Sequence, residues 1–256
     1  MPESFYGFPH LSKYAQGGIE TIFPDYIVHT FNIGGGFVVY NVSLIVEILI
    51  VGGGGGGGGG KIGVAHGGGG GGGGIHYGLL KLLPGPYTII VGNGGAGVGQ
   101  QILGNNGDSS SFITPIVTYI ANGGGGGGAN KNDSTKNGLN GGCGGGGGGQ
   151  YSGAAGNANQ PTIDPLTGYG FNGAAGTATS VSGGGGGAGG AASGNTGGIG
   201  RAYSISGSPI TYAAGANGDG SSTPAANTGK GGGGSANSNP TPSGASGIVI
   251  IRYPLE

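Results

Sequence analysis

The residues of this chain that could do chemistry are few and lie far apart in the sequence. Nine acidic residues are spread singly over 256 positions, whereas a glycosidase needs two carboxylates that flank one bond. A phosphate-binding loop of the Walker type needs a Lys followed by Ser or Thr, whose hydroxyl binds magnesium. Here Lys61 is followed by Ile62, and Lys230 is followed by Gly231. These patterns disfavour glycosidase and protease chemistry and a Walker-type phosphate site.

The histidines and the cysteine are also poorly placed for a metal site. His66 and His76 flank a glycine run that would hold them about 25 Å apart if it is extended. His10 and His29 have no partner at metal-ligand spacing. Cys143 is the single cysteine, so no intrachain disulfide can form. We therefore expect no metal, no cofactor, no catalytic residue and no enzymatic activity.

Charge and hydropathy argue against three further classes of protein. The net charge is −1, from 8 basic and 9 acidic residues, and no basic stripe could neutralise phosphates, so we expect no nucleic-acid partner. No apolar stretch approaches the roughly 20 residues that span a bilayer, which predicts no membrane insertion. The first residues lack the basic and apolar regions of a signal peptide, so secretion by that route is not indicated.

Glycine dominates the composition, with 76 of the 256 residues. Collagen would need a glycine at every third position and far more than the 13 prolines present. Glycine-rich chains without such a period are usually disordered. Only 7% of the residues are charged, however, and β-branched segments such as 43–51 favour an ordered fold. The glycines instead form runs at 52–60, 67–74, 123–128, 144–149, 183–187 and 231–234.

An ordered glycine run must bond to its neighbours, because it has no side chains to bury and loses much backbone entropy on folding. A polyproline-II-like helix has three residues per turn and no internal hydrogen bonds. A bundle of such helices could pair its N–H and C=O groups laterally, and only glycine allows the backbones to approach closely enough. Eight or nine residues would span roughly 25–28 Å. The sequence thus predicts a polyglycine-II bundle with polar segments as turns at its ends.

Short segments rich in Val, Ile, Phe and Tyr predict β-strands. The segment 44–51 is apolar on both faces, which indicates a strand buried on both sides. The strongly apolar segment 247–254 is expected to insert among the N-terminal strands. The remaining predictions are a hairpin of 26–32 with 36–41 across Gly34–Gly36, a strand at 87–91, a hairpin of 110–114 with 116–121, and a hairpin within 202–213.

These elements divide the chain into three parts. Residues 1–25 form an N-terminal arm, residues 26–121 with 247–256 form a β-rich domain with two polyglycine runs, and residues 122–246 form a glycine-rich insertion with polar loops. A linear chain of two domains is the alternative. The predicted fold is mostly β: antiparallel β-sandwich or jelly-roll-like strands plus a bundle of polyglycine-II helices, with no significant α-helix.

Recognition is expected in the polar loops and in the arm. Aromatic side chains among small polar residues suit adaptable contacts to glycans or proteins, although solvation or subunit packing would use the same residues. The arm could dock on a neighbour, or pack on its own domain, through Phe5, Tyr6, Phe8 and Tyr14. The candidate contacts in the loops are Lys131, Asp133, Lys136, Tyr151, Tyr169, Phe171, Arg201, Tyr203 and Tyr212.

An ordered series of motifs indicates a family. The motifs are Val28–Phe31, Val46–Val51 before polyglycine, Pro84–Gly97, Asn106–Phe112, Ser204–Tyr212 and Ser246–Pro254. Over residues 26–256 the sequence therefore resembles the glycine-rich domain of bacteriophage tail-fibre proteins and other virus-encoded structural proteins. In architecture it is similar to the tip adhesins of T-even-like phages, whose polyglycine-II helices form a sandwich with receptor-contacting end loops. It differs from them in its N-terminal β-rich part and in its more interrupted glycine runs.

The resemblance implies a structural protein of the virion surface or tail fibre. Such a rigid module would serve assembly, or attachment to a host surface glycan or outer-membrane protein. Its expected partners are other virion proteins and further copies of itself in a homo-oligomer, because exposed sheet edges need cover. Two alternatives stay open: a cellular glycine-rich fibril or matrix protein, which a signal peptide would favour, and an ice-binding protein, which regularly spaced glycine runs would favour.

Overall fold

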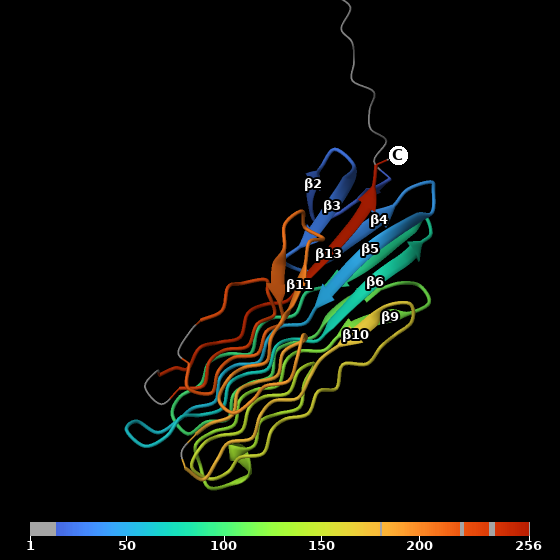
Figure 1. The fold of residues 1–256 in the computed structure, drawn as a ribbon. Helices are drawn as coiled ribbons and strands as arrows, with labels where there is room; N and C mark the ends of the chain where they lie inside the picture. The colour runs from blue at the N-terminus through green and yellow to red at the C-terminus, as the bar shows by residue number, and fades with distance from the viewer. Residues whose placement is uncertain (1–13, 180, 221–222, 236–238, 256) are drawn as a thin grey trace, which may run out of the picture.

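The computed structural model describes residues 14–179, 181–220, 223–235 and 239–255. Two parts lie end to end: a sandwich of β-strands and a bundle of extended glycine-rich segments (Figure 1). We call the end of the bundle that adjoins the sandwich the proximal end, and the opposite end the distal end. Within the described ranges there is no α-helix, and a single 3₁₀ turn, η1 (Ser134–Lys136), lies at the distal end.

The sandwich consists of two antiparallel sheets built from short β-branched and aromatic segments. The six-stranded sheet has the order β10-β6-β5-β13-β3-β2, the five-stranded sheet has the order β1-β4-β7-β8-β9, and β11 pairs with β12 in a separate hairpin. The strands are β1 (Ala15–Gln16), β2 (Ile19–Ile22), β3 (Tyr26–Phe31), β4 (Gly35–Val39), β5 (Leu44–Val51), β6 (Ile75–Leu82), β7 (Gly85–Ile90), β8 (Ser110–Ile113), β9 (Thr118–Ala121), β10 (Thr167–Tyr169), β11 (Arg201–Tyr203), β12 (Ile210–Tyr212) and β13 (Ile248–Pro254).

The last strand completes the six-stranded sheet. β13 lies between β5 and β3, where Ile250 pairs with Leu49 on one side and with Thr30 on the other. Its seven residues are mostly buried. This placement agrees with the expectation from its apolar sequence. Between β9 and β13 the chain builds most of the bundle and touches the sandwich again at β10 and at the β11–β12 hairpin. It then returns to the centre of the six-stranded sheet.

The core of the sandwich lies between the inner faces of the two sheets. Ile48 and Ile50 of β5 point inward and pack in one cluster with Phe37 from the opposite sheet. Leu49 points the other way and is covered by the β11–β12 hairpin. Burying each such side chain contributes about 2 kcal/mol. The second half of β5 is therefore buried on both sides as predicted, whereas Ile45 near its start is 63% exposed.

The predicted hairpin across Gly34–Gly36 is wrong. β3 and β4 belong to different sheets, and β4 pairs with β7 and β1. The chain crosses from one sheet to the other at this point, so that Phe31 and Phe37 meet in the core with ring centroids 6.3 Å apart. Apolar alternation in two neighbouring strands is compatible with either arrangement, because both arrangements bury one face of each strand.

Residues 14–25 also differ from the predicted arm. β1 pairs with β4 in one sheet, and β2 forms the edge of the other sheet beside β3. Tyr14 packs against the core, and its carbonyl oxygen accepts a hydrogen bond from the Tyr40 N–H at 2.8 Å. The side chains of β2 are mostly exposed, so the sequence lacked the apolar alternation that marks a strand. Phe5, Tyr6 and Phe8 lie outside the described residues.

Other predicted strands are confirmed. β7 and the hairpins β8–β9 and β11–β12 lie where the sequence indicates them. β6 and β10 were missed. β6 contains Gly78 and Lys81 and follows a glycine run directly, and β10 has only three residues, two of which are Thr167 and Gly168. Neither segment carries a clear two-residue apolar period.

The first glycine run has the three-residue repeat of a polyglycine-II helix. Every third N–H group points to the same neighbouring segment. The set that begins at Gly52 donates to carbonyl oxygens within 68–74 over 2.8–3.0 Å. The set that begins at Gly53 donates to carbonyl oxygens within 102–108, and the set that begins at Gly54 donates to carbonyl oxygens within 242–245. All nine N–H groups of 52–60 are paired in this way or with Ser235, which satisfies the requirement that buried backbone groups be bonded.

Three further segments donate to this run. The N–H groups of Gly124, Gly232 and Gly95 reach its carbonyl oxygens at 2.8, 2.9 and 2.8 Å. The run therefore lies at the centre of six neighbours. The second run repeats the pattern: its N–H groups bond, again in three sets, to segments 122–128, 183–186 and 229–232. The predicted polyglycine-II bundle is confirmed.

Close approach of the backbones explains why the runs consist of glycine. A Cβ added at Gly57 would overlap the carbonyl oxygen of Gly233, and one at Gly55 would overlap that of Gly125. The same overlap with a neighbouring backbone occurs at every position from 52 to 59. Backbone atoms cannot move aside as a flexible side chain can, so each methyl group would separate two hydrogen-bonded segments.

We predict that Gly57→Ala lowers the free energy of unfolding by at least about 3 kcal/mol, because the methyl group forces apart the segments that Gly57 touches. The matched control is Gly36→Ala in β4, where a Cβ would meet no atom within 4 Å, and this change should alter stability by less than about 1 kcal/mol. Chemical denaturation of the two variants measures the difference. Equal stabilities would contradict the close-packed bundle.

Candidate functional site

The turns at the distal end of the bundle carry side chains, which the glycine segments lack. The glycine segments are buried and carry no side chains, so polar and charged groups occur at the turns (Figure 1). Turns of this end lie at 61–66, 100–101, 129–136, 149–152 and 195–196. This end lies opposite the sandwich, to which both described ends of the chain belong.

Four of these turns form one continuous surface. The Gln101 N–H donates to the carbonyl oxygen of Gly60 at 3.1 Å, and the Gln101 side chain donates to that of Asn130 at 3.0 Å. Gly149 in turn donates to the carbonyl oxygen of His66 at 3.2 Å. These bonds join turns that are far apart in the sequence. We call residues 61–66, 100–101, 130–136 and 149–152 the distal surface.

Four of the predicted contact residues lie on the distal surface. Asp133 caps η1, accepting the Thr135 N–H at 2.9 Å, and pairs with Lys131 at 2.9 Å. The hydrogen bonds from Thr135 and the nearby Lys131 ammonium lower the pKa of Asp133 to about 2. Lys136 ends the 3₁₀ turn, and half-buried Tyr151 lies in the neighbouring turn. The structure therefore brings these four residues to one end.

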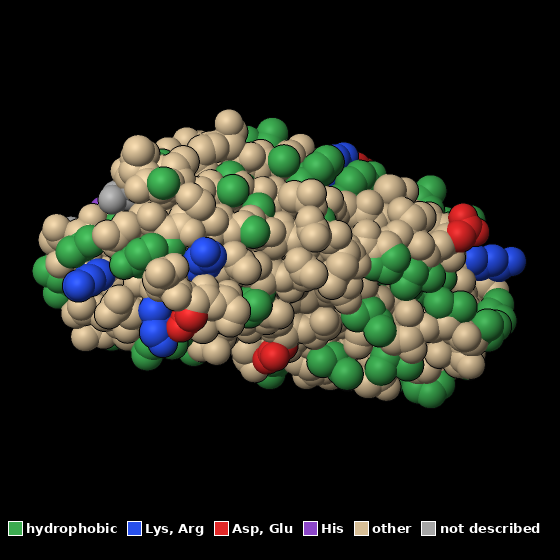
Figure 2. All heavy atoms as spheres, turned by 90° about the horizontal axis from the view of Figure 1, so that it is seen from below, with side chains coloured by type: hydrophobic (Ala, Val, Ile, Leu, Met, Phe, Trp, Pro, Cys, Tyr) green, Lys and Arg blue, Asp and Glu red, His purple; other side chains and the backbone are tan. Residues whose placement is uncertain are grey.

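The distal surface is more basic than the rest of the molecule. Lys61, Lys131 and Lys136 all lie on it, and Figure 2 shows basic side chains gathered toward the left end, which is the distal end in Figure 1. Lys131 is neutralised by Asp133. Among the residues that the structure describes, Lys61 and Lys136 form no ion pair within 4.0 Å. Exposed Ile62 and Val64 add apolar area beside them.

The other predicted contact residues lie at the proximal end, mostly in a ladder of aromatic and charged side chains. The Arg201 guanidinium lies 3.8 Å from the ring centre of Tyr169 and donates to the Tyr203 hydroxyl at 3.2 Å. The rings of Tyr203 and Tyr77 are 4.3 Å apart. Such cation–π and aromatic contacts each contribute about 1 kcal/mol. Together they fasten the β11–β12 hairpin to the six-stranded sheet.

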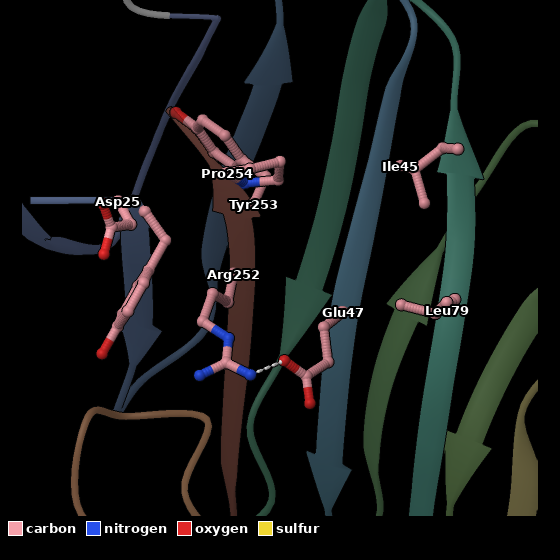
Figure 3. Close-up of a pocket in the computed structure, with 8 residues that line it drawn as sticks. Asp25, Ile45, Glu47, Leu79, Arg252, Tyr253 and Pro254 are labelled. Atoms are coloured by element: carbon pink, nitrogen blue, oxygen red, sulfur yellow. Dashed lines mark ion pairs between the residues drawn. The ribbon is translucent and has the colours of Figure 1, made fainter. Parts of the chain in front are cut away.

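The ladder continues across the centre of the sheet. The Tyr77 hydroxyl donates to Glu47. Glu47 is paired with Arg252 (Figure 3), and Arg252 lies 5.0 Å from the ring centre of Tyr26. Burial, followed by the hydrogen bond to Glu47, raises the pKa of Tyr77 to about 12. This ion pair was not predicted from the sequence. The only available signal was one charge in each of two apolar strands, and that signal does not identify the partner.

A pocket of about 500 Å³ lies beside the Glu47–Arg252 pair. Figure 3 shows Ile45 and Leu79 on one side of it and Arg252 on the other. Ile45 and Leu79 are each 63% exposed. The pocket is open and combines an apolar wall with an already neutralised ion pair, so its main charged groups are engaged within the protein.

The structure corrects the role of two predicted contact residues. Tyr203 is 9% exposed and Tyr212 is 1% exposed, so both pack the hairpin against the sheet and cannot meet a receptor. Burial raises the pKa of each of these tyrosines. Phe171 is 41% exposed, but it lies near the proximal end, where its carbonyl oxygen accepts the Gly144 N–H at 3.1 Å. The predicted set is therefore split between the two ends of the bundle.

Comparison with known families matches this architecture to one of them. The family described as a glycine-rich domain matches residues 34–254, from the residue before β4 through the whole bundle to the end of β13, while β1, β2 and β3 precede the matched range. The chain belongs to the glycine-rich domain family. No curated protein matches the chain. The family match covers the sandwich and the bundle together, so the glycine-rich domain includes both parts.

The described part of the glycine-rich domain lacks both a cluster of metal-binding side chains and a membrane-spanning helix. In the described ranges, no three His, Cys, Asp or Glu side chains are placed to share a metal ion. His66 lies at the distal end and His76 in β6, at opposite ends of the second glycine run. None of the helices in the described part of the chain has the length and apolar character to cross a membrane.

We predict that the carboxyl group of Asp133 stays ionised down to about pH 2, whereas in Thr135→Val its pKa rises toward the unperturbed 3.8. The hydroxyl of Thr135 stabilises the charged form, so its loss favours protonation. The stability that this pair contributes is therefore present above pH 4 and is lost as the pH falls toward 2. Carboxyl carbon NMR during an acid titration measures the pKa, with Thr118→Val in β9 as the control. An unchanged pKa in Thr135→Val would contradict the assigned cause.

Proposed function

We propose that this glycine-rich domain is a rigid, non-enzymatic module of a virion surface or tail fibre that presents the distal surface to a host receptor. The observation that carries the proposal is the six-neighbour hydrogen bonding of the glycine runs. All nine N–H groups of 52–60 and those of 68–74 donate to neighbouring segments, so the bundle acts as a stiff spacer. Its runs of eight or nine residues hold the distal surface roughly 25 Å from the sandwich.

The separation of a rigid glycine bundle from the turns that carry side chains supports this role. The glycine runs themselves contribute no side chains, and Cys143 among them is fully buried, while the turns at the distal end carry polar and charged residues. Binding proteins often separate a rigid scaffold from variable loops in this way. The described ends of the chain lie at the sandwich, which suits attachment of the sandwich to other virion proteins or to further copies of the chain.

The chemistry of the distal surface suits a polar receptor. Lys61 and Lys136 supply donors, Tyr151 supplies a flat ring, and Gln101 supplies an amide. Such groups bind the hydroxyl, phosphate or carboxylate groups of surface glycans and the polar loops of outer-membrane proteins. The resemblance of the sequence motifs to those of tail-fibre proteins favours this proposal over a fibril or matrix protein.

We predict that the triple change Lys61→Gln, Lys136→Gln and Tyr151→Ser reduces binding to host cells at least about tenfold, which is the loss of about 1.4 kcal/mol. The matched control is Lys81→Gln, an exposed lysine of β6 on the sandwich. Binding of purified, fluorescently labelled protein to cells of the host on which the particle grows measures the effect. Equal loss in both variants, or loss in neither, would refute attachment through the distal surface.

The location on a particle is tested separately. Mass spectrometry of purified particles should find the chain in a fixed ratio to the capsid protein, and antibodies against the distal surface should label intact particles. Absence from particles would overturn the virion assignment. A thermal-hysteresis activity of the purified protein would instead support the ice-binding alternative.

A further inference from the structure

The joint between the sandwich and the bundle contains a buried histidine. His76 is the second residue of β6, and β6 follows the glycine run 67–74 directly. Its side chain is fully buried. It is paired in register with Ile50 of β5 and with Gly168 of β10, and its ring is 6.4 Å from that of Tyr119 in β9. An ionisable group therefore lies where a glycine helix becomes a strand.

The Gln160 side chain ties this histidine to the surrounding backbone. Its Nε2 atom lies 2.9 Å from Nε2 of His76 and 3.1 and 3.2 Å from the carbonyl oxygens of Ile120 and Pro161, so its two hydrogens are shared among three acceptors. Its Oε1 atom accepts the Asn122 N–H at 2.7 Å. Asn122 precedes the glycine run 123–128, so one side chain connects the ends of two runs to the sandwich.

These contacts fix the orientation of the Gln160 amide. If the amide turned over, its NH₂ group would face the Asn122 N–H, and its oxygen would face the carbonyl oxygens of Ile120 and Pro161. Gln160 must therefore donate to Nε2 of His76, which has to be the unprotonated nitrogen. Gly74 leaves room for this arrangement, because a Cβ there would overlap Oε1 of Gln160. The hydrogen of the neutral ring is on Nδ1, which has no hydrogen-bond partner.

We propose that His76 is an acid-sensitive switch whose protonation opens the joint between the sandwich and the bundle. A proton on Nε2 would face the NH₂ group of Gln160, and two donors cannot bond to each other. The amide cannot turn over, so the charged ring has to move away from it. Gln160 would then release the Asn122 N–H, and the ends of the runs 67–74 and 123–128 would lose their shared contact.

The environment of the ring disfavours the charged form. Burial lowers the pKa of His76 below 6.5, and the carbonyl groups of Ile120 and Leu166 oppose this effect only in part. Since the folded protein binds this proton less readily than the unfolded chain, the joint is most stable above pH 6.5 and loses stability as the pH falls below it. Of the elements packed around His76, β5 and β10 contribute apolar Ile50 and Gly168.

Two other ionisable groups lie near the ring. Tyr119 faces it, and burial together with the negative charge of Asp164 raises the pKa of Tyr119, so Tyr119 stays neutral at the pH values concerned. Asp164 is exposed on the loop that follows Gln160. No carboxylate in the described part of the chain forms a hydrogen bond or ion pair with the ring of His76.

Among the described residues, the other fully buried histidine is His29, which has a hydroxyl partner that can change its hydrogen-bond role. His29 lies 2.7 Å from the Gly17 carbonyl oxygen through Nδ1 and 3.2 Å from the Tyr253 hydroxyl through Nε2. A hydroxyl group can rotate and accept a hydrogen bond where it formerly donated one. Protonation of His29 therefore needs no rearrangement of its partner. The locked amide of Gln160 distinguishes His76 from it.

The test is amide hydrogen exchange, resolved by NMR and corrected for intrinsic rates, at pH 7.5 and pH 5.5. We expect exchange of the Asn122 N–H to accelerate at least about tenfold at the lower pH, as one unit of pKa implies. The Gly58 N–H at the distal end should keep its protection. Equal acceleration at both positions would indicate global unfolding and would overturn a local switch.

Variants separate His76 from other causes. His76→Gln should remove the pH dependence at Asn122, while His66→Gln at the distal end should keep it. Gln160→Glu provides a second route if His76→Gln does not fold: its carboxylate would stabilise the charged ring, so the Asn122 N–H should be better protected at pH 5.5 than at pH 7.5. Acid-dependent exchange that persists in His76→Gln, or the absence of pH dependence in the unmodified protein, would refute the proposal.

Discussion

The approach of backbone to backbone in the bundle is the constraint on which the rest of the structure depends. Each central segment forms hydrogen bonds with six neighbours, and this geometry leaves no space for a Cβ between them. Ordering a glycine costs more conformational entropy than ordering any other residue. Lateral hydrogen bonds and close contacts must offset that cost over many segments together, so no single run could be ordered alone.

The sandwich fixes the register of the glycine runs, because the runs have no side chains that could fix it. β5 ends at Val51 and the first run begins at once, β6 begins directly after the second run, and β13 follows Gly247. Strands held by a core of large side chains thus fix where each helix starts and which way its N–H groups point. A bundle of identical glycines could otherwise slide by three residues without losing a contact, since its repeat is three residues.

The same constraint decides where chemistry can occur. Side chains are excluded from the inside of the bundle, so they gather at the distal turns, in the ladder from Tyr169 to Tyr26, and at the joint around His76. The ladder holds the hairpin on the sheet, and the joint ties the ends of the runs to the sandwich. Only the distal turns are both rich in polar groups and distant from the sandwich, which is why the proposed contact with a receptor is assigned to them.

The sequence by itself determined the classes of structure. Runs such as 52–60 permit only close-packed backbone, and apolar segments such as Leu44–Val51 and Ile248–Pro254 must form buried strands. It also identified the polar loops, of which Lys131 and Asp133 lie on the distal surface. Only the tertiary structure decided that β3 and β4 lie in different sheets, that Tyr212 is buried, and that Glu47 pairs with Arg252. The physical reason is that composition and period fix local conformation, whereas pairing depends on which distant segments meet. In a chain of glycines that choice is set by the few side chains at the ends of the runs.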